Sequence, residues 1–229
     1  MRSALVTGGS SGIGLAIARM LAEEEFVLTL ASRTREKVEA AAAELSADAV
    51  AFDARDADAC ARLVETHVER HGGLDVLVNS AGLGVAGGIE SQPVNHIDLQ
   101  LDVNLRGLVL VTKAALPHLR ETKGLVVNLA SIAGTGPVPE LPIYAATKAA
   151  VISLTRSLNA ALDADGVRVH ALCPGFVDTP MAAYSGLSPD EMIQPEDCAE
   201  VVRMLLRLSP RARVPQVVIE RIGSGPGGA

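Results

Sequence analysis

The sequence predicts an α/β fold, a doubly wound parallel β-sheet with helices on both of its faces. Two observations lead to this prediction. Short apolar runs alternate with longer amphipathic or alanine-rich segments along the 229 residues, which is the order of elements in β-α-β units. The first six runs are apolar almost throughout, as expected for strands that are buried on both faces.

Each apolar run predicts one strand, so we expect a sheet of about seven strands. The runs are residues 4–7, 26–31, 49–52, 76–79, 125–130, 167–173 and 216–220. The segments between them predict helices near residues 13–24, 35–45, 56–71, 98–121, 144–163 and 195–208. Pro117 lies inside the fourth helix, which we expect it to kink or shorten. Residues 1–222 predict one domain, and the glycine-rich residues 223–229 predict a flexible tail.

The composition argues against several kinds of partner and site. The formal net charge is −7 and the sequence has no basic block, so nothing favours binding to nucleic acid or to a membrane surface. Neither a membrane-spanning run nor a signal peptide is recognisable. The five histidines are scattered, and Cys60, Cys173 and Cys198 lie too far apart for a metal site or a disulfide framework. We therefore expect a cytoplasmic protein with reduced thiols and no metal ion.

A glycine-rich loop joins the first expected strand to the first expected helix. It reads Thr7-Gly8-Gly9-Ser10-Ser11-Gly12-Ile13-Gly14. Glycine permits left-handed turns and a close approach to a phosphate, and the helix N-terminus offers free N–H groups and partial positive charge. The hydroxyls of Thr7, Ser10 and Ser11 add donors. The loop therefore predicts a pyrophosphate site for a dinucleotide, and a tight turn without a ligand is the alternative.

The end of the second expected strand bears on the choice of nicotinamide cofactor. An acidic residue there would bind the ribose 2′-hydroxyl of NAD, whereas a basic residue accommodates the 2′-phosphate of NADP. The sequence has Ser32-Arg33-Thr34, without an acidic residue. Arg33 can offer a planar guanidinium to a phosphate. We predict that NADP(H) is preferred and NAD(H) possible, the alternative being that Arg33 is an exposed residue that binds nothing.

Two further strand ends predict contacts with the same ligand. Asp53, followed by Ala54, ends the third run, and its carboxylate can accept from an adenine amino group or can begin the next helix instead. Asn79-Ser80-Ala81-Gly82 ends the fourth run. Small residues there leave room at the carboxyl edge of the sheet, where such folds bind their ligands. An ordinary turn is the alternative for this segment.

The pairing of Tyr144 with Lys148 is the strongest indication of catalysis. The two residues are four apart, about one turn of the expected helix, so their side chains lie side by side on one face. A neighbouring ammonium favours the phenolate and lowers the phenol pKa from about 10 toward neutrality. A phenol with such a pKa can give or take a proton near pH 7, as general acid–base catalysis requires.

Taken together, these segments resemble the short-chain dehydrogenase/reductase family. The matching residues are Thr7 to Gly14, Asp53, Asn79 to Gly82, Asn104, Ser131, Tyr144 with Lys148, and Pro174-Gly175 with Thr179. The resemblance implies a Rossmann-like fold and a bound NAD(H) or NADP(H). It also implies hydride transfer between the nicotinamide and an alcohol or carbonyl group, in a homodimer or homotetramer.

The resemblance further implies a role for each matched residue. Tyr144 would exchange a proton with the substrate oxygen, while Lys148 would bind the ribose hydroxyls and lower the Tyr144 pKa. Ser131 would hydrogen-bond the substrate oxygen, and Asn104 would hold a water that relays protons from Lys148 to solvent. The segment Pro174-Gly175-Phe176-Val177-Asp178-Thr179 would close over the nicotinamide, with Thr179 bound to its carboxamide.

The residues around this expected site favour an apolar ketone, an apolar aldehyde or a secondary alcohol as the substrate. The candidate pocket residues are Ile132, Val138, Leu141, Phe176, Met181, Tyr184 and Met192, with packing in the core as the alternative for several of them. We expect residues 176–194 to form a lid. Two alternatives stay open: a non-catalytic NADP sensor on the same fold, and an epimerase or dehydratase that keeps NAD bound.

Overall fold

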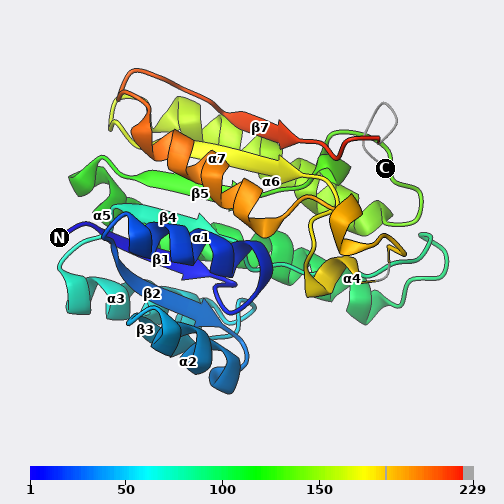
Figure 1. Ribbon diagram of the computed structural model, residues 1–229, viewed down its shortest axis with the longest axis horizontal. Coiled ribbons are helices and arrows are strands. Elements are labelled where there is room, and N and C mark those ends of the chain that lie inside the picture. Colours follow the sequence, from blue (N-terminus) through cyan, green and yellow to red (C-terminus); the bar gives the residue numbers. More distant parts are fainter. Residues whose placement is uncertain (184, 224–229) are drawn as a thin grey trace.

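A seven-stranded parallel sheet forms the centre of the computed structural model, which describes residues 1–183 and 185–223 (Figure 1). The strands are β1 (Ser3–Thr7), β2 (Val27–Ser32), β3 (Asp48–Ala51), β4 (Val76–Asn79), β5 (Leu125–Leu129), β6 (Arg168–Pro174) and β7 (Gln216–Ile219). They stand in the order β3-β2-β1-β4-β5-β6-β7, and neighbours are parallel. The predicted doubly wound sheet is confirmed, with its switch of direction between β1 and β4. Tyr184 and residues 224–229 of the expected tail lie outside the described residues.

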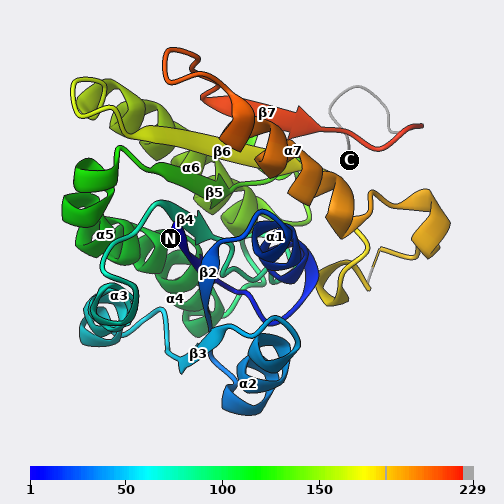
Figure 2. The same cartoon turned by 60° about the vertical axis from the view of Figure 1, so that its left-hand side comes forward.

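Helices cover both faces of the sheet, as Figures 1 and 2 show. On one face lie α1 (Gly12–Glu23), α2 (Arg35–Glu44) and α7 (Pro195–Arg207). On the other lie α3 (Ala57–His71), α5 (Leu108–Thr122) and α6 (Pro142–Ala161), and the short α4 (Val94–Leu101) leads toward α5. In the described part of the chain, no helix is both long and apolar enough to cross a membrane.

The side chains of β1 explain why whole strands are apolar. Leu5 belongs to the core that α3 and α5 cover, and Val6 belongs to the core that α1 and α7 cover. Both are fully buried, because successive residues of a strand face opposite sides of the sheet. Full burial of one such side chain contributes about 1.5–3 kcal/mol. The sheet is therefore held between two helical layers, and its carboxyl edge is a rigid platform.

The helix predicted over residues 98–121 is longer and less regular than predicted. Helical structure runs from Val94 to Thr122, with the π-helical turn η1 (Asp102–Gly107) between α4 and α5. Pro117 lies inside α5 without ending it, so the expected shortening is wrong. Leu119 beside it is fully buried in the core, and packing of this kind outweighs the single hydrogen bond that a proline removes.

Candidate active site

The loop between β1 and α1 approaches its neighbours more closely than a side chain would allow. Gly8 has a left-handed backbone (φ +68°), and a Cβ there would lie 2.7 Å from the backbone nitrogen of Ala81. A Cβ on Gly14 would collide with the carbonyl oxygen of Gly8. Gly12 is also left-handed, with a φ of +53°. Glycine suits all three positions, and the loop folds tightly against the backbone that follows β4.

The N-terminus of α1 has the properties of an anion-binding site. Ser11 is the N-cap residue, yet its side chain makes no cap hydrogen bond to the described chain, and the first turn has no acidic residue. The first N–H groups of a helix have no partner within the helix, and its dipole adds partial positive charge. Ser11, Gly12 and Ile13 line a cavity. A pyrophosphate fits these donors, since no acidic side chain of the first turn competes for them.

The cavity has a volume of about 640 Å³ and lies at the carboxyl ends of β1, β4, β5 and β6. This volume suits a small-molecule ligand. Predicted site residues that line it are Gly8, Ser10, Ser11, Gly12, Ile13, Ala81, Gly82, Ser131, Tyr144, Lys148, Pro174, Gly175, Val177 and Thr179. The predicted apolar pocket residues Ile132, Val138, Leu141, Phe176 and Met181 line it too. Met192 is not among the described lining residues, so its assignment to the pocket is wrong.

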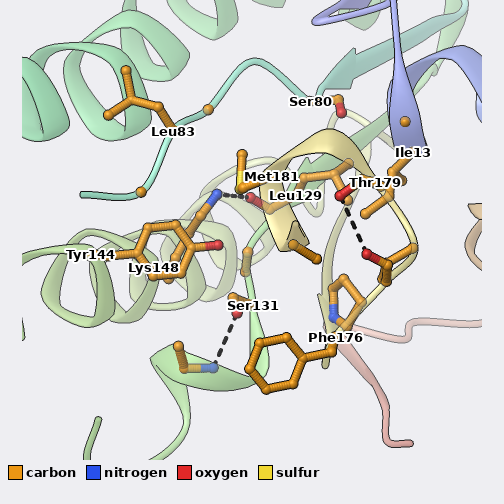
Figure 3. Close-up of a pocket in the computed structure, with 18 of the residues that line it drawn as sticks. Ile13, Ser80, Leu83, Leu129, Ser131, Tyr144, Lys148, Phe176, Thr179 and Met181 are labelled. Carbon is orange, nitrogen blue, oxygen red and sulfur yellow. Dashed lines mark hydrogen bonds between the residues drawn. The ribbon is translucent and has the colours of Figure 1, made fainter. Parts of the chain in front are cut away.

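Tyr144 and Lys148 stand in the first turns of α6, which begins at Pro142. A proline at the first position of a helix already has the helical φ angle and lacks only an N–H that would be unpaired there. The Lys148 Nζ lies 5.5 Å from the centre of the Tyr144 ring. Figure 3 shows the two side chains next to each other, and Ser131 lines the same cavity. A spacing of four residues on one helix produces this proximity.

The Lys148 side chain is almost completely buried, with 5% of its surface exposed. Its Nζ donates to the carbonyl oxygen of Leu129 at 2.6 Å. Burial lowers the pKa of Lys148 to about 8, because a low-dielectric environment disfavours the charged form. At neutral pH the ammonium therefore stays mostly protonated, and it places a positive charge beside the phenol of Tyr144.

Ser131 follows β5 and begins the short 3₁₀ helix η2 (Ile132–Gly134). Its Oγ accepts a hydrogen bond from the N–H of Ala133 at 3.1 Å, which orients the side chain. A hydroxyl that accepts one hydrogen bond can still donate its own hydrogen. Ser131 and Tyr144 line the same cavity, so both hydroxyls open onto the space in which a substrate oxygen would lie.

Asn104 stands in the π-helical turn η1 and links two walls of the site. Its Oδ1 accepts from the N–H of Leu83 at 2.8 Å, and its Nδ2 donates to the carbonyl oxygen of Leu83 at 2.8 Å. The same Nδ2 lies 3.2 Å from the Oγ1 of Thr147, the neighbour of Lys148. π-helical turns are rare and frequent at functional sites. The helical pattern of the sequence contains no signal for this one.

Known proteins are similar to this chain in sequence and in fold. The model of the short chain dehydrogenase family matches residues 2–189. The chain belongs to the short-chain dehydrogenase family. It is 36% identical over 223 residues to an uncharacterized oxidoreductase of Staphylococcus aureus (strain MW2), with 96% of each chain covered. An uncharacterized oxidoreductase of Staphylococcus epidermidis is 32% identical over 222 residues, again with 96% of each chain covered.

Solved structures of similar short-chain dehydrogenases contain nicotinamide dinucleotides. An alcohol dehydrogenase of the archaeon Thermococcus sibiricus in complex with 5-hydroxy-NADP has a TM-score of 0.91, 32% identity and 99% coverage of both chains. A short chain dehydrogenase of Burkholderia cenocepacia with NADP has a TM-score of 0.88, 32% identity and coverage of 95% and 96%. A variant of actinorhodin polyketide ketoreductase with NADPH has a TM-score of 0.87, 32% identity and coverage of 95% and 94%. The present short-chain dehydrogenase is an NAD(P)-dependent oxidoreductase.

In this short-chain dehydrogenase, backbone hydrogen bonds join the two ends of the segment expected to form a lid. The N–H of Ile193 donates to the carbonyl oxygen of Phe176 at 3.0 Å, and the N–H of Asp178 donates to that of Ile193 at 2.9 Å. The lid also reaches the glycine loop, because a Cβ on Gly12 would lie 2.9 Å from the Cγ2 of Thr179. The glycine loop and the described residues that follow β6 therefore both border the cavity.

A second group of predicted residues, Ser32, Arg33, Asp53 and Ala54, lies at the ends of β2 and β3 and does not line the cavity. Arg33 is exposed, and none of the described residues forms an ion pair with it. The Asp53 carboxylate accepts from the Arg55 Nη2 at 2.6 Å and from the Arg55 N–H at 3.0 Å. The Arg55 guanidinium lowers the pKa of Asp53. Arg55 was missed by the sequence analysis, although an Asp-x-Arg spacing in a turn allows this pairing.

The predicted residues Thr7 and Asn79 lie behind the wall of the cavity. The Asn79 Nδ2 donates to the Thr112 Oγ1 at 3.0 Å and to the Asn128 Oδ1 at 2.9 Å. The Thr7 Oγ1 accepts from the N–H of Ala81 at 3.3 Å. These contacts fix the end of β4 and the backbone that follows it, so both residues support the cavity wall from behind.

The cysteines of the described chain are buried and form no disulfide. Burial raises the pKa of Cys60 and Cys173 to about 11 and that of Cys198 to about 12. Such thiols stay protonated at neutral pH and are poor nucleophiles. Within residues 1–183 and 185–223, no group of His, Cys, Asp and Glu is arranged to hold a metal ion.

Proposed function

We propose that this short-chain dehydrogenase transfers hydride between NADP(H) and an apolar ketone, an apolar aldehyde or a secondary alcohol. One observation carries the proposal: Tyr144, Lys148 and Ser131 line the same cavity as the N-terminus of α1, where the Ser11 side chain makes no cap hydrogen bond to the described residues. A phenol that can exchange protons and a helix end that can bind a pyrophosphate thus open onto one space.

Two side chains would act on the substrate oxygen, and a third would act through one of them. In the direction of reduction, Tyr144 donates its phenolic proton to the carbonyl oxygen, and in oxidation it takes that proton from the alcohol. Ser131 donates a hydrogen bond to the same oxygen and holds it in place. The Lys148 ammonium favours the phenolate that remains after proton donation, which is why we predict a lowered pKa for Tyr144.

The remaining proposed residues would bind the dinucleotide, which, when bound, supplies or accepts the hydride at its nicotinamide ring. The N–H groups of α1 and the hydroxyls of Ser10 and Ser11 would bind the pyrophosphate. Lys148 would also bind ribose hydroxyls, Thr179 the carboxamide, and Asp53 the adenine amino group. Asn104 would hold the water of a proton relay from Lys148.

A preference for NADP(H) over NAD(H) is supported by the end of β2. Arg33 is exposed there, and the segment from Ser32 to Thr34 has no acidic residue to repel a 2′-phosphate. A guanidinium matches the geometry of a phosphate. The three solved relatives with NADP, NADPH and 5-hydroxy-NADP are consistent with this preference.

The choice of an apolar, uncharged substrate is supported by the walls of the cavity. Lys148 is the one charged side chain among the described residues that line it. Its ammonium is assigned to Tyr144 and the ribose. A charged substrate would have to be buried there without a partner, which is costly. Apolar residues such as Val138, Leu141 and Phe176 would surround the rest of the molecule.

The test is a screen of small apolar ketones and aldehydes, in which oxidation of NADPH is followed by its absorbance. We expect turnover of some of them, and a Tyr144→Phe variant should lose turnover while it binds NADPH as tightly as the wild type. Turnover that persists in Tyr144→Phe would refute the acid–base assignment. NADPH binding without turnover of any carbonyl or alcohol would favour the non-catalytic sensor.

We also propose that residues 1–222 act as one domain and that the protein is a homodimer or homotetramer. Val94, Leu101 and Val109, on α4 and α5, are apolar residues with 71%, 41% and 38% of their surfaces exposed. Exposed apolar side chains on surface helices often mark a subunit interface. Light scattering on the purified protein tests this proposal, and a monomeric mass at micromolar concentration would contradict it.

A further inference from the structure

In the loop between β4 and α4, side chains supply the hydrogen-bond partners of the Leu83 and Val85 backbones. Residues 80–93 include no helix or strand, yet buried backbone N–H and C=O groups need partners. Asn104 binds both backbone groups of Leu83, at 2.8 Å each. Two glutamines do the same for Val85: its N–H donates to the Gln100 Oε1 at 3.2 Å, and its carbonyl oxygen accepts from the Gln92 Nε2 at 2.7 Å.

The side-chain amides of Gln100, in α4, and Asn104, in η1, bind the backbone of the loop. Gln100 and Asn104 are four residues apart, so they lie one above the other on one helical face. They bind alternate residues of the loop, Leu83 and Val85, as a neighbouring strand would. The loop is thereby held at these residues without belonging to the sheet.

Gly84, between the two bound residues, and Gly82, just before them, lie close to Tyr144 and Lys148. A Cβ on Gly84 would lie 3.4 Å from the Tyr144 Cδ2, and a Cβ on Gly82 would lie 3.5 Å from the Lys148 Nζ. Figure 3 shows the segment that carries Leu83 passing beside Tyr144 and Lys148. The backbone at Gly84 is therefore a wall against one edge of the phenol ring, and its place depends on the amides.

The side-chain amides of Gln92 and Gln100 bind each other and the surrounding backbone. Gln100 is 0% exposed, and its Nε2 donates to the Gln92 Oε1 at 3.0 Å and to the carbonyl oxygen of His96 at 3.2 Å. The Gln92 Nε2 also contacts the carbonyl oxygen of Gly87 at 3.3 Å. Each amide thus has partners for both of its N–H hydrogens and for its oxygen. A network of this kind admits one arrangement, so it fixes the loop in one position.

We propose that Gln100 and Gln92 are positioning residues for Tyr144, a role that rests on the proposed function of Tyr144 as the acid–base. They keep Val85 in place, and through it they hold Gly84 against the ring and Leu83 in the cavity wall. Without them the loop moves away from the ring, and the phenol is no longer confined to the direction from which it reaches the substrate oxygen. A displacement of about 1 Å at a reacting group costs as much as 100-fold in rate.

The variant Gln100→Leu tests the proposal, and Asn159→Leu is its matched control. Asn159, in α6, binds one residue in the same way, because Val169 donates its N–H to the Asn159 Oδ1 at 3.1 Å and accepts from the Nδ2 through its carbonyl oxygen. Asn159 is 5% exposed, and it lies about 20 Å along the helix from Tyr144. Both variants lose a buried amide that binds backbone, but only Gln100→Leu affects the loop at Tyr144.

The two variants are compared in melting temperature, NADPH dissociation constant, kcat and the pH dependence of kcat. We expect both melting temperatures to fall and both dissociation constants to stay at the wild-type value. The kcat of Gln100→Leu should fall by roughly 10- to 100-fold, with an altered pH profile, while that of Asn159→Leu should not change. A Gln100→Leu variant that loses stability but keeps its kcat and pH profile would overturn the proposal, as would an equal loss of kcat in Asn159→Leu.

A second readout does not depend on turnover. The chain has no tryptophan and two tyrosines, so a Tyr184→Phe background leaves Tyr144 as the single tyrosine. The ring signal of isotopically labelled Tyr144 should shift or broaden in Gln100→Leu and stay unchanged in Asn159→Leu. If the wild type has no turnover, the proposed function fails, whereas the ring signal still decides whether the amides hold Tyr144. If Gln100→Leu does not fold, Gln92→Leu should show the same change in the Tyr144 ring signal. Loss of folding in both variants would overturn the proposal, since the two glutamines would then be needed for folding.

Discussion

Replacement of Lys148 by methionine should slow carbonyl reduction by roughly 100-fold. The Lys148 Nζ lies 5.5 Å from the centre of the Tyr144 ring. With the phenolate charge taken at the ring centre and an effective dielectric constant of about 20, a unit charge at this distance stabilises the phenolate by about 3 kcal/mol. About 1.4 kcal/mol corresponds to a tenfold change in rate, so the loss amounts to about two powers of ten.

We expect Lys148→Met to fold like the wild type, with the methionine side chain in the position of the lysine. The two side chains are of similar length, and an apolar group avoids the cost of a buried charge. That cost is visible in the pKa of Lys148, which burial lowers from 10.5 to about 8. The hydrogen bond to Leu129 is lost in the variant, but we expect the two effects to offset each other and the melting temperature at pH 7 to stay near that of the wild type.

The same pKa shift predicts how stability depends on pH. Below about pH 8 the amine is charged in the folded and the unfolded chain, and above about pH 10.5 it is neutral in both. Between these values the unfolded chain binds a proton that the folded chain does not, so the folded state gains stability as the pH rises. The gain is on the order of 3 kcal/mol in the wild type and is absent from Lys148→Met.

The assay is kcat at saturating NADPH and carbonyl substrate, combined with urea unfolding across this pH range. Lys113→Met, which removes an exposed lysine of α5, is the matched control and should leave both quantities unchanged. A kcat for Lys148→Met that equals the wild-type value would refute the electrostatic argument. The free energy of unfolding should differ between wild type and Lys148→Met by an amount that varies with pH. A difference that is constant across this pH range would show that burial does not lower the pKa of Lys148.

Two further substitutions test the cofactor end of the site. Arg33→Asp should reverse the ratio of kcat/KM for NADPH and NADH, because a carboxylate repels the 2′-phosphate and binds the ribose hydroxyl. The control Arg35→Asp, which removes the ion pair with Glu39, should leave this ratio unchanged. An unchanged ratio in Arg33→Asp would show that Arg33 does not select the cofactor. Gly12→Ala should weaken NADPH binding at least tenfold, roughly 1.4 kcal/mol, because Gly12 is left-handed and a Cβ would press on Thr179 at 2.9 Å. Gly88→Ala, at a position with open space around the new Cβ, should bind as the wild type does in a fluorescence titration, and equal binding by both glycine variants would contradict the argument.

Those parts of the fold and site that depend on local sequence could be predicted. The sheet follows from apolar runs whose burial on both faces leaves few alternatives, and every strand ends within one residue of its prediction. The proximity of Tyr144 and Lys148 needs only one turn of helix. The glycine loop likewise depends on the conformations that glycine alone adopts.

The parts that depend on tertiary contacts could not be predicted. The π-helical turn at Asn104 gives no periodic signal, and it lies where a Cβ on Gly107 would be 2.6 Å from the carbonyl oxygen of Ala54. Gln92 and Gln100 form no recognisable motif, since one is in a loop and the other in a helix. Their function in the network becomes apparent only when Val85 lies between them.

The measurement that tests the central claim most directly is a titration of the Tyr144 phenol by its near-ultraviolet phenolate absorbance. In a Tyr184→Phe background Tyr144 is the single tyrosine, and no tryptophan contributes. We predict a pKa clearly below the ordinary value of about 10, and an increase in that pKa when Lys148→Met is added. A pKa of about 10 or higher that is the same with and without Lys148 would contradict the account.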